Sequence, residues 1–418
     1  MRPLNLTEPM PAHIAIHHVT KWPLWMLAFR PYFLAGGLLA FLSIGYWLLI
    51  LTGYASWHLT MPATLWHAHE MLFGFAGVVA VGFLLTAAQT WTGVESISGK
   101  ALMLLTFVWI SARLAFFIKL PDFANANLWL VTLLQLAWWL GAITALANML
   151  LTARSKNNYP FLVILSVLCA LNTLYLLLVL NNNMRLALAV VDTAVLVVSL
   201  LVGIVAGRVI PFFTAKGLAL SEQVHTSKID KAMLYLSILA ITLFFISKLF
   251  LSSISSAFIV AIVAALHLIR AKLWWHANVL KVPLLWSLHF SYFALGVGLM
   301  MIAMSFYTSE VHFKDALHLI TIGTIGMMIL AMMTRVSLGH TGRTLNTPKY
   351  ISVAFAFVLV AAITRSILPL IIAPHFAWQI SALLWLVAFL LFLIYFSFCF
   401  FLQRETKKEK RRKITKSL

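Results

Sequence analysis

Long apolar runs separated by short polar stretches form the main pattern along the chain. Each run is close to the roughly 20 residues that a helix needs to cross a bilayer. Little sequence is left over for a soluble domain. The pattern predicts an all-α, polytopic membrane protein with about twelve transmembrane helices, near residues 32–53, 65–89, 100–119, 127–152, 159–180, 185–207, 231–251, 256–273, 284–307, 314–334, 350–371 and 377–402.

The basic residues are distributed unevenly between the two sides of these spans. Of the 30 Lys and Arg residues, 24 lie in the N-terminal segment, in the connections from even-numbered to odd-numbered spans, and in the C-terminal tail. Positive charge is retained on the cytoplasmic side, so both termini are predicted to be cytoplasmic. The expected organisation is an interfacial segment at 1–31, a transmembrane domain at 32–402 and a polybasic tail at 403–418 that lies on anionic lipid or binds a partner.

Composition excludes a soluble enzyme. The chain is 62% hydrophobic and 10% charged, so its net charge of +19 indicates membrane sidedness and not nucleic-acid binding. Cys169 and Cys399 lie inside apolar stretches, so any metal is expected to use histidine, methionine or carboxylate ligands. The first 31 residues are too polar and too long for a cleavable signal, and residues 34–51 are expected to be an uncleaved first span.

The second span begins with three ionisable residues, His67, His69 and Glu70. Such groups are costly in a membrane helix and usually functional. On a regular helix His67 and Glu70 share a face, whereas His69 points about 200° away. His67 and Glu70 are therefore candidates for a copper site, or for hydrogen bonds that orient a metal-ligating side chain. His69 faces the other way and would bind a different group. Glu70 could instead be a catalytic proton donor.

The tenth span repeats part of this pattern. His69 and His318 are each followed by glycines five and eight residues later, namely Gly74 and Gly77, and Gly323 and Gly326. This spacing favours two helices that face each other across a metal cofactor, with haem as the leading candidate and His69 and His318 as its ligands. The alternative is that both histidines hydrogen-bond within the bundle and the glycines only allow close helix packing.

Three further charged residues lie within about two turns of the same end of their spans: Arg113, Asp192 and Arg365. The planar, bidentate guanidinium group suits a haem propionate, so Arg113 and Arg365 are candidate cofactor-binding residues. Alternatively, an intramembrane arginine and Asp192 pair with each other.

A second layer of polar residues is expected at the cytoplasmic end. At about 1.5 Å per residue, His289 lies about 20 Å from His318 in depth, so one metal cannot bind both. His289 shares its layer with His340, Arg208 and Arg335, and His289 with His340 forms a second candidate metal site. The glycine-flanked turn at 338–343 could instead bind an anion.

Spans two, six and ten are four spans apart, and all three run towards the cytoplasm. This spacing favours an arrangement of three groups of four helices. This arrangement loosely resembles the main subunit of the haem-copper oxidases. However, span ten has one histidine and spans six and seven have none, so the usual three-histidine copper centre is not expected.

Several blocks closely resemble the NnrS family. They are WHAHEMLFGF at 66–75, GFLLTA at 82–87, WTG at 91–93, RPYF at 30–33, RVIPFF at 208–213, the pair Trp286 and His289, the spacing of His318, Gly323 and Gly326 in the tenth span, and RVSLGHTGR at 335–343. The resemblance implies a twelve-span bacterial inner-membrane protein that contains haem and copper and is associated with nitric oxide and nitrosative stress.

The resulting hypothesis is redox handling of nitric oxide or its iron–nitrosyl products at a haem, with an unidentified electron donor. The expected partners are the lipid bilayer and this small gaseous ligand. Two other classes stay open. One is a transporter in which buried histidines and Glu70 relay protons or bind substrate, and the other is a gas or metal sensor without turnover.

Overall fold

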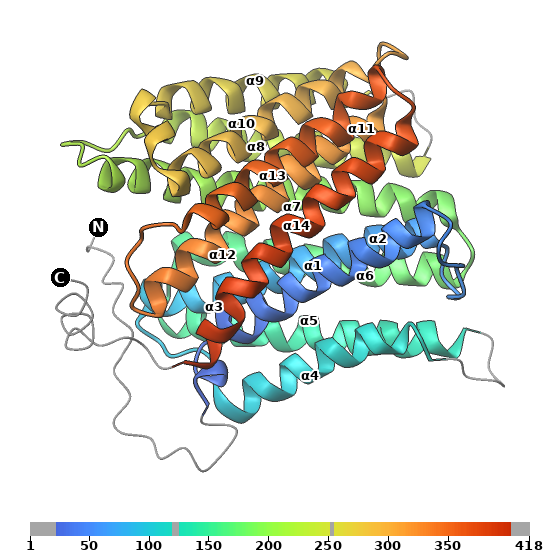
Figure 1. Ribbon diagram of the computed structural model, residues 1–418, viewed down its shortest axis with the longest axis horizontal. Helices are drawn as coiled ribbons and strands as arrows, with labels where there is room; N and C mark the ends of the chain where they lie inside the picture. Colours follow the sequence, from blue (N-terminus) through green and yellow to red (C-terminus); the bar gives the residue numbers. More distant parts are fainter. Residues whose placement is uncertain (1–21, 119–124, 251–254, 403–418) are drawn as a thin grey trace.

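The computed structural model describes residues 22–118, 125–250 and 255–402, and Figure 1 shows their long helices lying side by side in a bundle. The polybasic tail and the histidines of the first 21 residues lie outside the described part, so the predictions about them stay predictions.

All regular elements within the described residues are helical, which confirms the predicted fold class. Short 3-10 turns precede or join several of the helices. The main elements are α1 (Phe29–Leu51), α2 (Ala63–His69), the π-helix η3 (Glu70–Ala76), α3 (Gly77–Thr92), α4 (Gly99–Ala115), α5 (Ala126–Thr152), α6 (Tyr159–Leu180), α7 (Met184–Gly217), α8 (Ser227–Phe250), α9 (Ala257–Trp274), α10 (Pro283–Met304), α11 (Phe313–His318), the π-helix η6 (Leu319–Gly326), α12 (Met327–His340), α13 (Lys349–Ser366) and α14 (Pro374–Phe401).

The number of spans agrees with the prediction. In the described part of the chain, eleven helices are long and apolar enough to cross a membrane. Two of these are composite: α2, η3 and α3 form one span at Ala63–Thr92, and α11, η6 and α12 form another at Phe313–His340. Helix α4, with 17 residues, is the twelfth helix of the bundle.

Helix ends were predicted less well than helix positions. The sixth span was expected to end near residue 207, but α7 continues through Pro211 to Gly217. That prediction was wrong because the apolar run ends before the helix does. A helix satisfies its own backbone groups beyond the apolar stretch, and proline is tolerated within membrane helices. The tenth span likewise runs to His340, six residues beyond the predicted end.

Three spans form the centre of the bundle. In the spans Ala63–Thr92, Met184–Gly217 and Phe313–His340, 78% of the most apolar stretch is buried, more than in any other span of the described residues. Helix α7 contacts both η3 and η6, so it lies between the two composite spans. These are spans two, six and ten, the set whose spacing suggested three groups of four helices.

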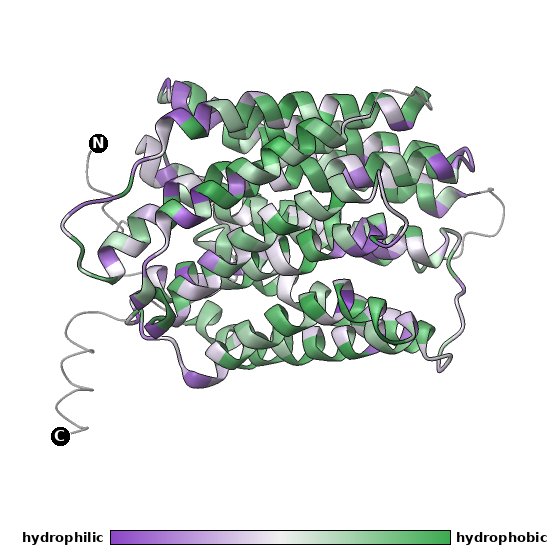
Figure 2. Ribbon diagram, turned by 90° about the horizontal axis from the view of Figure 1, so that it is seen from above, coloured by the Kyte–Doolittle hydropathy of each residue, from purple (hydrophilic) through white to green (hydrophobic). Residues whose placement is uncertain are grey.

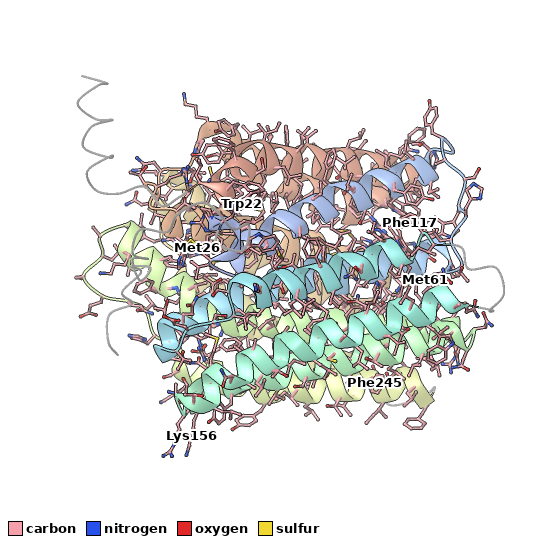
Figure 3. All side chains as sticks on the ribbon, turned by 90° about the horizontal axis from the view of Figure 1, so that it is seen from below. Trp22, Met26, Met61, Phe117, Lys156 and Phe245 are labelled. Carbon is pink, nitrogen blue, oxygen red and sulfur yellow. The ribbon has the colours of Figure 1, made fainter. Side chains whose placement is uncertain are left out.

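The two ends of the bundle carry most of the hydrophilic segments, and its middle is largely hydrophobic (Figure 2). Figure 3 shows Trp22 and Lys156 at one end and Met61 and Phe117 at the other. We call these the basic end and the opposite end. At the basic end, Arg30 Nη1 donates to the carbonyls of Phe400 and Leu402, which joins the start of α1 to the end of α14.

Candidate functional site

Both spans with the shared histidine–glycine spacing change from α-helix to π-helix directly after the histidine. Segment η3 begins at the residue after His69, and η6 begins at the residue after His318. π-Helical segments are rare and occur frequently at functional sites. The structure therefore adds a second feature that the two spans share at the same position, and nothing in the sequence reasoning predicted it.

The shared glycines permit close packing around these segments. A Cβ atom on Gly326 would lie 2.5 Å from the Trp385 ring, and one on Gly77 would lie 3.3 Å from Trp139. This much agrees with the alternative that the glycines serve helix packing. It leaves open what the histidines do.

A buried polar cluster surrounds His69. It consists of His69, Glu70, Arg113, Gln135 and Asn172, contributed by α2, η3, α4, α5 and α6, and each residue is at least 93% buried. His69 Nδ1 lies 2.9 Å from Glu70 Oε1, and Arg113 Nε donates to Glu70 Oε2 over 3.1 Å. His69 Nε2 lies 3.0 Å from Asn172 Oδ1 and 3.3 Å from Gln135 Nε2.

The hydrogen bonding of His69 Nε2 is incomplete. The ionised Glu70 carboxylate accepts the Nδ1 proton, so a neutral His69 has a lone pair on Nε2. That lone pair accepts from Gln135 Nε2 but cannot bind an amide oxygen. Asn172 Nδ2 and Gln135 Oε1 are both buried without a hydrogen-bond partner. A water molecule can accept from Asn172 Nδ2 and donate to Gln135 Oε1, whereas a metal ion on Nε2 would take the place of the Gln135 hydrogen bond.

His67 and His318 are associated with a different set of side chains. The His67 ring stacks on Trp47 with centroids 4.7 Å apart, and its Nδ1 is buried without a hydrogen-bond partner. His318 Nδ1 donates to the Lys314 carbonyl over 2.6 Å. His67 and His318 lie in the neighbourhood of each other and of Arg365.

The expected approach of His69 to His318 is not seen as a ring contact. Within the described residues, the ring of His69 contacts Phe73, Phe116 and Tyr175, and no ring contact joins it to His318. The Glu70 carboxylate binds the His69 ring and not that of His67. The ligand assignments therefore stay predictions.

The intramembrane arginines have partners other than the one considered from sequence. Arg113 pairs with Glu70, so the suggested pairing of an arginine with Asp192 is wrong for this residue. Asp192 instead binds Lys314 Nζ over 2.7 Å. The Arg365 guanidinium binds Asp315 and lies over the Trp378 ring at 4.9 Å.

The residues of the predicted second layer make separate contacts. His289 Nε2 lies 2.9 Å from Thr214 Oγ1, and the ring of His340 packs on Phe29 with centroids 5.4 Å apart. Arg335 stacks on the Phe213 ring. In the part of the chain that the structure covers, no ring contact links the two histidines, and no three His, Cys, Asp or Glu residues gather as a metal site. Cys169 and Cys399 are both buried.

Several buried polar residues were missed from sequence. Gln135 and Asn172 were overlooked because each is an amide without a charged residue in its span. His267 and Arg270 of α9, with Tyr292 of α10, form a second hydrogen-bonded group. A usable signal was present, because His267 and Arg270 are one helical turn apart in a largely apolar helix, which is the pattern expected of functional intramembrane groups.

The comparisons with known proteins agree with the family resemblance. Comparison with curated proteins gives no match. The family described as NnrS protein matches residues 23–404, which includes every described helix from α1 to α14. The chain therefore belongs to the NnrS family.

Proposed function

We propose that this protein binds haem and copper in a bacterial inner membrane and handles nitric oxide or iron–nitrosyl species by redox chemistry. Membership of the NnrS family supports the association with the nitric oxide response. The buried His69 and the half-buried His67 and His318 of the two composite spans support a metal cofactor, since imidazole is a common ligand of both iron and copper.

One observation carries the proposal. In both His69 and His318, Nδ1 donates to an oxygen atom, of the Glu70 carboxylate in one case and the Lys314 carbonyl in the other. Metal-ligating histidines almost always have this arrangement, because the second hydrogen bond fixes the tautomer and the ring orientation. It leaves Nε2 of each ring as the nitrogen that can bind a metal, which in His69 would replace the hydrogen bond from Gln135 Nε2. The donor chemistry of the residues present therefore fits the cofactors.

The residues would have the following roles. His69 and His318 are the proposed haem ligands, and His67, with its unpartnered Nδ1, is the proposed copper ligand or the alternative partner of His318. Haem, when bound, supplies an iron centre that binds nitric oxide and exchanges electrons. Glu70 orients His69 and is the carboxyl group nearest to it that can take up or release a proton.

The remaining candidates have supporting roles. Arg113 and Arg365 would compensate negative charge on the cofactor, and each is already held in place by one carboxylate. His289 and His340 are proposed for a second metal site at the basic end. Each has one ring contact with an aromatic side chain that limits its orientation.

The test is a set of single substitutions, His67→Ala, His69→Ala and His318→Ala, with the exposed His58→Ala as a matched control. Each protein is purified in detergent from haem-sufficient cells, checked for a single size-exclusion peak and measured by reduced-minus-oxidised and pyridine haemochrome spectra. We expect His69→Ala and His318→Ala to lose or shift the haem signal and His58→Ala to retain it.

The same set distinguishes between the two ligand pairings. Loss of haem in His67→Ala and His318→Ala, with haem retained in His69→Ala, would assign His67 and not His69 as the partner of His318. Full haem content in all three variants would contradict the proposed site.

A further inference from the structure

A second buried hydrogen-bonded group runs inward from the basic end through α8, α9 and α10. Asp230, near the start of α8, has a side chain that is 39% exposed, and it accepts from Arg270 Nη1 over 2.7 Å. Arg270 Nε donates to the Tyr292 hydroxyl over 2.5 Å, and this hydroxyl lies 2.6 Å from His267 Nδ1. Arg270, Tyr292 and His267 are all at least 97% buried.

This group favours one tautomer of His267. Arginine has no acceptor, so the Tyr292 oxygen accepts from Arg270 Nε. If His267 Nδ1 also donated to this oxygen, the buried Tyr292 proton would have no acceptor, so we expect the hydroxyl to donate to Nδ1 and a neutral His267 to carry its own proton on Nε2. Within the described residues, the hydrogen bond of His267 is made by Nδ1, and none is seen at Nε2. Because Nε2 is not among the fully enclosed polar atoms that lack a partner, it retains accessible surface, and a molecule from outside the chain can accept a hydrogen bond from it.

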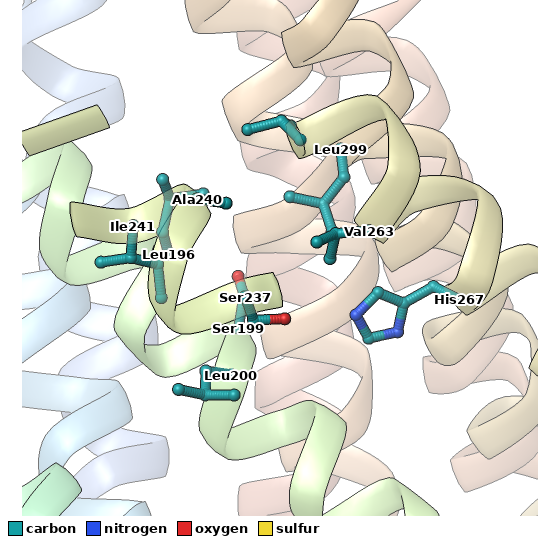
Figure 4. A pocket seen from close by; sticks show the side chains of 10 residues that line it. Leu196, Ser199, Leu200, Ser237, Ala240, Ile241, Val263, His267 and Leu299 are labelled. Atoms are coloured by element: carbon teal, nitrogen blue, oxygen red, sulfur yellow. The ribbon is translucent and has the colours of Figure 1, made fainter. Parts of the chain in front are cut away.

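The donor faces a small cavity about half way along α8 and α9 (Figure 4). The cavity measures about 30 Å³, and its polar lining residues are Ser199, Ser237 and His267. Ser199 donates its proton to the Val195 carbonyl and so offers only lone pairs to the cavity. The rest of the lining is apolar, from residues such as Val263 and Leu299. Because one water molecule needs about 10–15 Å³, one or two small molecules fit.

Two glycines of α7 allow α9 to lie this close. A Cβ atom on Gly203 would lie 3.2 Å from His267 Cε1, and one on Gly207 would lie 3.2 Å from Arg270 Nη1. The Gly203 carbonyl also accepts from Arg270 Nη2 over 2.8 Å. The Gly-x3-Gly spacing thus serves to hold His267 and Arg270 against α7, and the orientation of the His267 ring follows from this packing.

We propose that this cavity is a binding site for a small uncharged molecule, of one to three heavy atoms, that accepts a hydrogen bond from His267 Nε2–H. Water and a dissolved gas share this chemistry. A charged ligand does not fit, because Arg270 is already paired with Asp230 and the cavity lining carries no ionised side chain. The site shares no residue with the proposed haem site, so it stands independently of that proposal.

The test is solid-state NMR of the full chain in lipid bilayers with ¹⁵N-labelled histidine, with the His267 signal assigned by its loss in His267→Gln. We expect His267 to be neutral and protonated on Nε2. In water-edited spectra its Nε2–H signal should receive magnetisation from water. A second sample is equilibrated with nitrous oxide, an uncharged molecule of three heavy atoms.

The outcomes separate the two sources of ligand. Contact with water that nitrous oxide does not alter identifies a water site, and a shift that follows the nitrous oxide concentration identifies a dissolved-gas site. A His267 protonated on Nδ1, or an Nε2–H group that responds to neither, would overturn the proposal.

Filling the cavity provides the control. Ser237→Leu should abolish whichever response is seen, whereas Ser247→Leu, the same change on the same helix outside the cavity lining, should leave it unchanged. If Ser237→Leu does not fold, Ala240→Val fills the same space with a smaller change. A response that persists in a folded, cavity-filled variant would also contradict the assignment.

Discussion

At the scale of single residues, charge within the bundle is neutralised in pairs that join different helices. Among the described residues, the carboxylates of Glu70, Asp192, Asp230 and Asp315 each bind one lysine or arginine side chain. Burying an unpaired charge in a membrane is expensive, and pairing reduces that cost. The Glu70–Arg113 pair is the most buried of the four and adds a hydrogen bond to His69.

We expect Arg113→Met to destabilise the protein by about 3–5 kcal/mol, because it leaves the Glu70 carboxylate buried without its cation. Thermal unfolding in detergent measures this, and the exposed Arg185→Met is the matched control, with an expected effect within about 0.5 kcal/mol. The double variant Glu70→Gln/Arg113→Met should recover most of the loss. Equal stability of Arg113→Met and Arg185→Met would show that the ion pair is not formed.

The same residues show where sequence reasoning succeeds and where it stops. The apolar length of a span is a local property, so the twelve helices could be predicted, as could the shared spacing around His69 and His318. Which side chain meets which depends on how neighbouring helices are rotated. From sequence, Arg113 had a haem propionate or Asp192 as its candidate partner, and the packing of the neighbouring helices instead places it against Glu70.

At the scale of elements, the two π-helical segments distinguish η3 and η6 from the other helices in the described part of the chain. They could not be predicted because a change from α to π geometry is one residue of register, set by packing and not by composition. In η6, Gly326 lies against Trp385 of α14, and the whole composite span packs between α10 and α13.

We expect Gly326→Ala to destabilise the protein by about 1–3 kcal/mol, since its Cβ would lie 2.5 Å from the Trp385 ring and the core around it would have to shift. Gly339→Ala in the same span is the control. It meets open space, so its better helix propensity should make it neutral or stabilising by up to about 1 kcal/mol. Thermal unfolding of both variants compares them, and the opposite order would contradict the packing of η6 against α14.

At the scale of the whole molecule, the bundle is a closed arrangement in which α14 packs back against α1. The most buried spans lie at its centre and carry the histidines of the proposed haem site. The distribution of basic residues predicts that the end with Lys156 faces the cytoplasm and that α2, which starts at the opposite end, has its histidines near the other face.

A cysteine-labelling experiment tests this orientation. Tyr54→Cys lies in the connection before α2 and Glu222→Cys lies in the connection before α8, and both positions are exposed. A membrane-impermeant maleimide should label Tyr54→Cys in intact spheroplasts and Glu222→Cys only after lysis. The two native cysteines are buried and give little background. The reverse labelling pattern would invert the topology.

The most direct measurement is the haem and copper content of the purified wild-type protein. A pyridine haemochrome spectrum and elemental analysis are made on detergent-purified protein from haem-sufficient cells. We predict a coloured protein with haem and copper in amounts comparable to the protein itself, and loss of haem in His318→Ala. A colourless, metal-free wild-type preparation that is folded and monodisperse would contradict the account.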